Sequence, residues 1–396
     1  MSRNGIRSFQ TGRLTQALAA RQLSQAQLAD MVGVSPATIT KWKKGIQAPE
    51  SETLDRLASV LNVTADWFTR NPVETSSPLF RSNASAHVVA REKLGARMAW
   101  GEEIVRHLEQ FVDLPKLNLP TRPFQTAHEI SELELEAAAR ECRDLWRLGR
   151  VAIQDLALAV ESAGVVLFRE ETGITQIEGL SAWSGDRPLI LLSADKANGY
   201  RSRFDLAHEI AHLVLHRNIK IDSTDKAQHH LLEKQAHFFA GALLLPAETF
   251  AREIRIPPTL DDLLVLKKRW GVSVAAMIMR LEALGIIDEF GSQNLFKRRS
   301  ARWGGKAEPG DKDLVPEAPR LLRRTIDLIV ESNVMPIEAI PRLCGLWSGD
   351  VERLVGLPFG YLTGANNVVQ LARLRDVEST ANQLNTPGVV LPFRRR

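Results

Sequence analysis

The sequence has few cysteines, no long apolar run and little net charge. Its two cysteines, Cys142 and Cys344, stand far apart and form no Cys-x-x-Cys pair, which argues against a disulfide framework. No stretch approaches the roughly 20 apolar residues of a membrane span, and the N-terminal stretch MSRNGIRSFQTGR lacks the apolar core of a secretory signal. These absences predict a soluble protein of the reducing cytoplasm, with no membrane partner.

The composition is that of a folded chain with more than one domain. Of the 396 residues, 44% are hydrophobic and 25% are charged, which is typical of globular proteins. A chain of this length exceeds one ordinary domain, so we expect two or three. The formal net charge of +4 and the pI of about 9.1 are compatible with a nucleic-acid partner but do not identify one.

The N-terminal segment contains two short helix patterns joined by a glycine turn. Ser24 and Gln27 form a capping box ahead of the first pattern, which ends at Gly33. Ser35, followed by Pro36, then caps the second. Helix, tight turn and helix together are the helix-turn-helix pattern, whose second helix enters the major groove of DNA by its N-terminal residues.

The candidate DNA contacts follow from this docking geometry. The lysines would contact phosphates, whereas Thr38 and Gln25 could reach phosphates or base edges. Residues 1–70 carry nine Lys and Arg against five Asp and Glu, an excess that suits DNA. The alternative is a helical module that binds protein. The candidate residues are Gln25, Ser35, Ala37, Thr38, Lys41, Lys43 and Lys44.

Residues 11–70 resemble the XRE/Cro-type repressor domain. The resemblance is carried by SQAQLADMVGVSPATITKWKKG and by the closing LDRLASVLNVTADWF. It implies binding to double-stranded DNA through residues 1–70, usually as a homodimer.

A connecting region and a small sheet follow. NPVETSSP, residues 71–78, is a polar linker, and the next stretch predicts long helices separated by a proline-punctuated segment. Short strands are expected at 164–168, 179–183 and 188–193, the last two joined by the hairpin turn SGDR. The strand around Ser181 to Trp183 could hold a substrate backbone by strand addition, or could be an ordinary structural hairpin.

The strongest motif is H-E-x-x-H within FDLAHEIAHLVLH, residues 204–216. His208 and His212 lie one helical turn apart on one face, so both imidazoles can reach one metal ion. Glu209 can bind or deprotonate a water there, which is the minimal arrangement of a zinc hydrolase. The alternative is a pair of core histidines, hydrogen-bonded to backbone.

A third ligand is expected because catalytic zinc takes three protein ligands and keeps one position open. Glu233 lies near the start of a second apolar helix, 21 residues after His212. His229, His230 and His237 compete with it. His216 extends the stripe of His208 and His212 by one more turn, although a cap on the last turn of that helix is the favoured role. Imidazole and carboxylate ligands suit zinc, and also manganese or cobalt.

A second resemblance extends over this region. The chain is similar to the ImmA/IrrE family of metallopeptidases through SAW, KANGYRSRFDLAHEIAHLVLH, E-x-x-A-x-x-F-A-x-x-L-L-L-P and LKKRWGVS. The resemblance implies a zinc ion held by His208, His212 and Glu233, with Glu209 as general base. The family often has Asp or Asn four residues after the ligand glutamate, where this chain has His237. Fused members carry both modules in one chain, and members with known partners cleave repressors of mobile-element or stress-response genes.

The C-terminal part has helix patterns over 260–284 and 316–357, with a basic stretch at 296–312 that we expect to be a loop. The patterns around Gly345 could form a second, degenerate helix-turn-helix, but a plain helical scaffold is favoured. The tail LNTPGVVLPFRRR is expected to be flexible.

The predicted fold is α+β and mostly α, with four regions. These are a five-helix helix-turn-helix domain (1–70), a linker and helical connection (71–149), a zincin-like metallopeptidase domain (150–290) and a helical C-terminal region with a basic tail (291–396). The predicted function is a DNA-associated zinc endopeptidase and transcriptional regulator that cleaves a repressor- or antitoxin-like protein. The alternative is a DNA-binding regulator whose metal domain senses or binds a partner without proteolysis.

Overall fold

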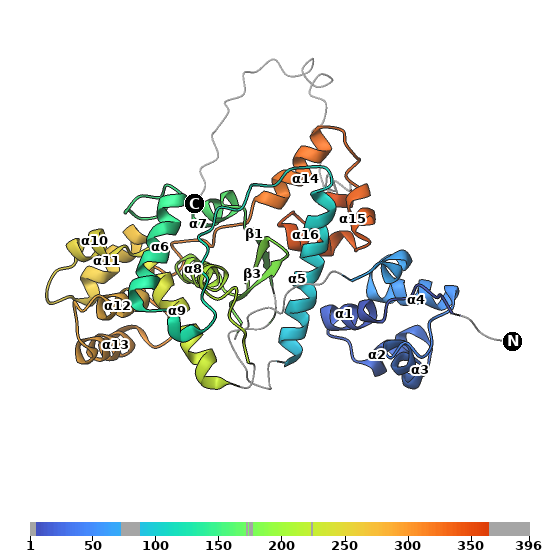
Figure 1. Cartoon of the computed structure of the whole chain (residues 1–396), viewed down its shortest axis with the longest axis horizontal. Helices are drawn as coiled ribbons and strands as arrows, with labels where there is room; N and C mark the ends of the chain where they lie inside the picture. The colour runs from blue at the N-terminus through green and yellow to red at the C-terminus, as the bar shows by residue number, and fades with distance from the viewer. Residues whose placement is uncertain (1–4, 73–87, 172, 174–176, 223–224, 364–396) are drawn as a thin grey trace, which may run out of the picture.

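The computed structural model describes residues 5–72, 88–171, 173, 177–222 and 225–363 (Figure 1). Helices dominate, with one three-stranded sheet near the centre, which confirms the α+β, mostly α prediction. Most of the predicted linker, the first part of the long helices expected after it and the predicted flexible tail lie outside the described residues. Among the described helices, none combines the length and the hydrophobicity that a membrane span requires.

The N-terminal domain forms the predicted helix-turn-helix. The Ser24 hydroxyl accepts the Gln27 N–H at 3.2 Å and completes the capping box. Gly33 adopts a left-handed φ of +77°, which lets the chain turn sharply into the next helix. The elements are α1 (Thr11–Arg21), α2 (Gln25–Val32), α3 (Pro36–Lys43), α4 (Ser51–Leu61) and the 3-10 helix η1 (Ala65–Thr69).

The sheet has the strand order β1-β3-β2 and combines both pairing modes. β3 pairs parallel with β1 and antiparallel with β2, to which a two-residue turn joins it. β1 begins two residues later than expected, because Gly164 has a φ of +86° and belongs to the turn after α7. β2 is an end strand of this sheet and lies against α8. The strands are β1 (Val166–Glu170), β2 (Gly179–Ser184) and β3 (Arg187–Ser193).

The described residues form two hydrophobic cores. The first core lies among the N-terminal domain, the sheet and the C-terminal helices, and the second lies among the sheet and the helices around it. α8 and α9 pack against each other in the centre of this region, and α6 covers α9 (Figure 1). The helices are η3 (Ala127–Glu129), α6 (Glu132–Leu145), α7 (Leu156–Ser162), α8 (Gly199–Leu215), α9 (Lys226–Leu244), α10 (Ala247–Phe250), η4 (Ala251–Glu253), α11 (Leu260–Trp270), α12 (Val274–Ala283) and α13 (Glu289–Trp303).

The predicted loop at 296–312 is wrong in its first half, because α13 extends to Trp303. Asp288 caps this helix by accepting the Gly291 N–H at 2.8 Å. Leu295 and Arg299 are buried one turn apart, and Arg299 donates to Glu308 at 2.9 Å. The basic residues obscured an amphipathic pattern whose buried face is narrow.

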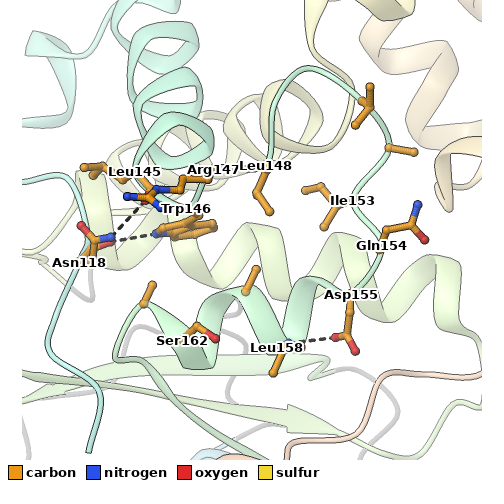
Figure 2. Close-up of a pocket in the computed structure, with 14 residues that line it drawn as sticks. Asn118, Leu145, Trp146, Arg147, Leu148, Ile153, Gln154, Asp155, Leu158 and Ser162 are labelled. Carbon is orange, nitrogen blue, oxygen red and sulfur yellow. Dashed lines mark hydrogen bonds between the residues drawn. The ribbon is translucent and has the colours of Figure 1, made fainter.

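A cavity of about 560 Å³ lies between the end of α6 and α7 (Figure 2). Trp146 lines it and donates its Nε1–H to the Asn118 carbonyl at 2.9 Å. Its one carboxylate, Asp155, accepts the Leu158 N–H at 2.9 Å and pairs with Arg320. Because that carboxylate is committed to holding α7, the lining offers no assembled catalytic group.

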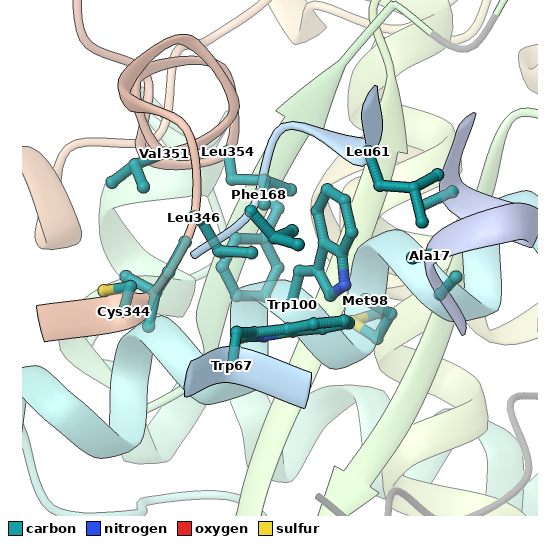
Figure 3. Close-up of a cluster of buried hydrophobic side chains, with 14 of the residues drawn as sticks. Ala17, Leu61, Trp67, Met98, Trp100, Phe168, Cys344, Leu346, Val351 and Leu354 are labelled. Atoms are coloured by element: carbon teal, nitrogen blue, oxygen red, sulfur yellow. The ribbon is translucent and has the colours of Figure 1, made fainter. Parts of the chain in front are cut away.

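The long helix α5 (Val88–Leu108) joins the N-terminal domain to the C-terminal helices. Trp67 of η1, Trp100 of α5, Phe168 of β1 and Leu346 meet in one buried cluster (Figure 3). Trp67 and Trp100 pack edge to face with ring centroids 6.0 Å apart. The C-terminal elements are α14 (Leu321–Glu331), α15 (Ala339–Cys344), α16 (Ser348–Val355) and η5 (Tyr361–Thr363).

The C-terminal helices form a scaffold. α16 would be the DNA-reading helix of a second helix-turn-helix, yet Val351, Leu354 and Val355 are buried against the first core. Asp350 and Glu352 on the same helix are also buried. A helix enclosed on most of its surface cannot enter a groove of DNA, which supports the scaffold interpretation.

Buried ion pairs cross between the three parts of the chain. Asp350 of α16 binds Arg21 of the N-terminal domain and, at 2.7 Å, Arg97 of α5. Arg97 also binds Glu170 of β1 at 2.7 Å. Burial opposes the charge on Arg97, but these two carboxylates outweigh it and raise its pKa. The helix-turn-helix is thereby tied to both the sheet and the C-terminal scaffold.

Both cysteines are free and buried, as the sequence predicts for a protein without disulfides. Burial raises the pKa of the Cys344 thiol to about 12. Such a thiol is protonated at neutral pH and is therefore an unreactive packing group.

Candidate metal centre

The two motif histidines lie side by side on buried helix α8. Asn198 caps the helix by accepting the Arg201 N–H at 3.1 Å. The Nε2 atoms of His208 and His212 are 3.1 Å apart, and both rings are almost fully buried. Two imidazole nitrogens this close require a proton or a cation between them.

Glu233 of α9 completes the group. Its two carboxylate oxygens lie 3.4 Å from His208 Nε2 and 3.5 Å from His212 Nε2. Burial would raise the pKa of Glu233, but hydrogen bonds and charge from the two histidines outweigh it and hold the pKa well below its usual range. The carboxylate is therefore ionised at neutral pH.

These three residues fit a zinc ion. Bonds of about 2.0–2.1 Å at tetrahedral angles place ligand atoms roughly 3.3 Å apart. The observed separations of 3.1, 3.4 and 3.5 Å match that spacing, and the donor set of two imidazoles and one carboxylate is one that zinc accepts. A bound ion would also resolve the close approach of the two nitrogens.

His237 lies beside this group. One ligand atom each of His208, Glu233 and His237 fall within 4.8 Å of one another, a looser set than the one with His212. His237 Nδ1 lies 2.7 Å from the Glu233 carbonyl oxygen, which can only accept, so Nδ1 carries the proton. This protonation leaves the lone pair of His237 on Nε2. Because the set with His212 is tighter, we assign His212 as the ligand and place His237 beside the site.

Glu209 is held by the sheet. The Ser181 hydroxyl of β2 donates to Glu209 Oε2 at 2.8 Å, and both side chains are buried. A Cβ on Gly179 would lie 3.2 Å from Glu209 Cγ, so the glycine permits this close approach. The sequence left open whether the strand from Ser181 to Trp183 holds substrate or is a structural hairpin, and both alternatives stay predictions. The structure adds that the Ser181 side chain orients the carboxylate of the motif.

A chain of hydrogen bonds fixes the ring of His212. Gln235 Nε2 donates to the Ala127 carbonyl at 2.7 Å, which turns Gln235 Oε1 toward His216 Nε2 at 3.3 Å. Burial and its histidine neighbours hold the pKa of His216 well below its usual range, so this ring is neutral. Since His216 Nε2 donates to Gln235, His216 Nδ1 accepts from His212 Nδ1 at 2.9 Å. In the neutral form of His212, the form that binds a metal, the lone pair is thus left on Nε2, on the side of Glu233.

The sequence alone does not give the roles of His216 and Gln235. His216 was considered as a helix cap or a further ligand; it is the C-cap residue of α8, and its ring supports His212. Gln235 was missed, although a polar residue two positions after Glu233 in a strongly apolar helix is a signal that could have identified it.

The structure also places the predicted DNA-contacting residues. Ser35, Ala37, Lys41 and Lys44 are exposed, and Gln25, Thr38 and Lys43 are half-buried. Thr40 donates its hydroxyl to Gln25 Oε1 at 3.0 Å, which leaves the Gln25 amide nitrogen directed elsewhere. These residues come from α3, from the residues that cap its two ends and from the start of α2.

The fold and the site define a protein with a helix-turn-helix and a metallopeptidase-type centre, and comparisons with known families agree. Residues 160–282 match the family model described as the IrrE N-terminal-like domain, and residues 14–68 match the helix-turn-helix model. The chain joins an XRE-type DNA-binding domain to an ImmA/IrrE-like peptidase domain, as both resemblances predicted. No curated protein matches the chain.

Proposed function

We propose that this protein is a DNA-associated zinc endopeptidase that cleaves a repressor- or antitoxin-like protein. The observation that carries the proposal is the convergence of His208, His212 and Glu233 beside a buried, oriented Glu209. A plain core histidine pair would not need a third ionised ligand and a second carboxylate next to it.

His208, His212 and Glu233 would hold the zinc ion, which supplies Lewis acidity toward the peptide carbonyl and makes water more acidic. Glu209 accepts a proton from the water that attacks the carbonyl carbon and passes it to the departing amine nitrogen as the C–N bond breaks. Ser181 keeps Glu209 in the orientation for this transfer, and His216 keeps His212 in the tautomer that binds metal.

The helix-turn-helix would place this activity at DNA. The exposed Lys41 on α3 and Lys44 directly after it provide phosphate contacts, and domains of this kind usually bind as homodimers. A DNA-bound repressor near the same operator is then the natural substrate, and cleavage would release genes of a stress response or a mobile element.

Metal content and cleavage test the proposal together. The full chain is purified, its zinc and manganese are quantified, and it is incubated with the repressor encoded nearest to its gene. We expect one zinc ion per chain. We also expect cleavage that a chelator abolishes and that added zinc restores. Bound zinc with no cleavage of any supplied repressor would favour a regulator that senses a partner without cutting, and absence of metal would contradict the site.

Gln235→Leu is expected to weaken zinc binding about 10- to 100-fold, the usual cost of losing a partner of a ligating histidine. The substitution removes the acceptor that orients His216, so His212 loses its fixed tautomer. Zinc affinity is measured by competition with a chromogenic chelator.

Two further variants serve as controls for Gln235→Leu. Gln235→Glu keeps an acceptor oxygen for His216 but loses the amide donor to the Ala127 carbonyl, so the affinity should fall by less than in Gln235→Leu. Gln228 lies on the same helix but donates its side-chain amide to the Lys220 carbonyl, so Gln228→Leu should leave the zinc affinity unchanged. Equal affinities for Gln235→Leu and the wild type would disprove the role of the chain from Gln235 to His212.

The double substitution Lys41→Ala and Lys44→Ala is expected to weaken DNA binding and to reduce the slope of log K against log salt by about 2, since each phosphate contact contributes about 1. Fluorescence anisotropy with an operator fragment, titrated at several salt concentrations, measures both quantities. The matched control replaces Lys306 and Lys312, which are exposed in the loop after α13. An unchanged slope for the α3 variant would exclude these phosphate contacts.

A further inference from the structure

A cavity of about 560 Å³ opens beside the metal centre, between α8, α9 and α12. Glu233 and His237 both form part of its wall. Phe204, one turn before His208 on α8, also lines the cavity and lies 5.8 Å from His237 between ring centroids. The His237 ring in turn lies 4.6 Å from that of His208, so the cavity is continuous with the site.

One part of the lining of this cavity is apolar. This part consists of the rings of Phe204 and Phe238, the side chain of Met279 and the small residues Gly241 and Ala276. Met279 is 47% exposed. Flexible, polarisable methionines are common on surfaces that accept varied apolar ligands.

The charges of the lining do not favour an ionic ligand inside. Arg280 is the only buried cation among the lining residues, and Glu136 binds it through both carboxylate oxygens. Arg280 also donates to the Leu245 carbonyl at 3.0 Å and stacks over Phe238. Since this cation is already neutralised, it supports the wall and is not available to an anion. Glu233, the one carboxylate of the lining that is largely buried, belongs to the metal centre. The other charged lining residues, Glu132, Lys234 and Glu282, are exposed.

We propose that this cavity is a specificity pocket that takes a bulky apolar side chain of the substrate, next to the bond that is cut. The volume is in the range of ligand pockets and accommodates a phenyl, leucyl or methionyl side chain. The inference rests on the proposed function, because it requires the scissile bond to lie at the zinc site. It adds that the substrate class is a peptide segment with a large apolar residue at the cleavage point.

Two hydroxamic acids separate the pocket from the metal. Acetohydroxamic acid would bind through the zinc ion alone. 3-Phenylpropionohydroxamic acid carries in addition a phenyl group that can enter the cavity. With the zinc-loaded full chain, the phenyl compound is expected to bind about 10- to 100-fold more tightly, as burial of an aromatic group predicts. Calorimetry measures both dissociation constants and gives their ratio.

Met279→Glu should reduce this ratio several-fold, because it puts a carboxylate into the apolar wall. The matched control is Val265→Glu, which adds the same charge at an exposed position on α11 outside the cavity and should keep the ratio. Equal affinity of the two compounds for the wild type, or a ratio that Met279→Glu leaves unchanged, would overturn the pocket. Failure of both compounds to bind, together with absence of zinc, would overturn the proposed function itself.

Discussion

Glu209→Gln is expected to slow cleavage of the partner protein by about 10²- to 10⁴-fold, the range for loss of a general base. The glutamine keeps the size of the side chain and can still accept the Ser181 hydroxyl, but it cannot take a proton from water. Zinc content should remain that of the wild type, because the ligands are untouched. Cleavage is followed on gels or by mass spectrometry over a time course.

Two variants bracket this result. Ser181→Ala leaves the carboxylate in place but removes its orienting hydroxyl, so we expect a smaller loss than for Glu209→Gln. Glu171→Gln neutralises an exposed carboxylate outside the site and should cleave at the wild-type rate. If Glu209→Gln also cleaved at the wild-type rate, the assignment of the general base would be wrong.

Asp350→Ala is expected to lower the free energy of unfolding by about 3–5 kcal/mol, the cost of breaking a buried ion pair on one side. The substitution leaves Arg21 and Arg97 with one counter-charge fewer in a region where both are largely enclosed. Both guanidinium groups lie 5.0 Å from the Trp100 ring, which is one of the eight tryptophans whose fluorescence follows unfolding. Urea titration with that signal measures the change.

The matched control is Asp66→Ala, which breaks an ion pair with Arg70 near the surface. The Asp66 carboxylate is 61% exposed, so solvent screens this pair and we expect a loss below about 1 kcal/mol. Equal destabilisation by the two substitutions would show that the buried network does not hold the N-terminal domain in place.

Elements with strong local signals were predictable from the sequence. The capping box of Ser24 and Gln27, the left-handed turn at Gly33 and the start at Pro36 set the helix-turn-helix, because each acts within a few residues. The spacing of His208 and His212 acts in the same way, since one helical turn determines which face they share.

Features that depend on tertiary contacts were less accessible. Burial of α16 against α5 and β1 decides between a scaffold and a second DNA-binding unit, and no local pattern encodes it. The partnership of Ser181 with Glu209, 28 positions apart, depends on how β2 crosses α8. The first half of the stretch 296–312 was predicted as a loop because its many basic residues hide the few buried positions of α13.

Val63, near the end of the N-terminal domain, and Leu346, directly before α16, form an isolated antiparallel β-bridge. The Gly345 carbonyl accepts the Thr64 N–H at 2.9 Å in the same place. The two ends of the described chain are therefore a single structural unit with the peptidase region inserted between them. A transplant of the DNA-binding specificity into another protein would have to carry α14 to α16 along with residues 1–70.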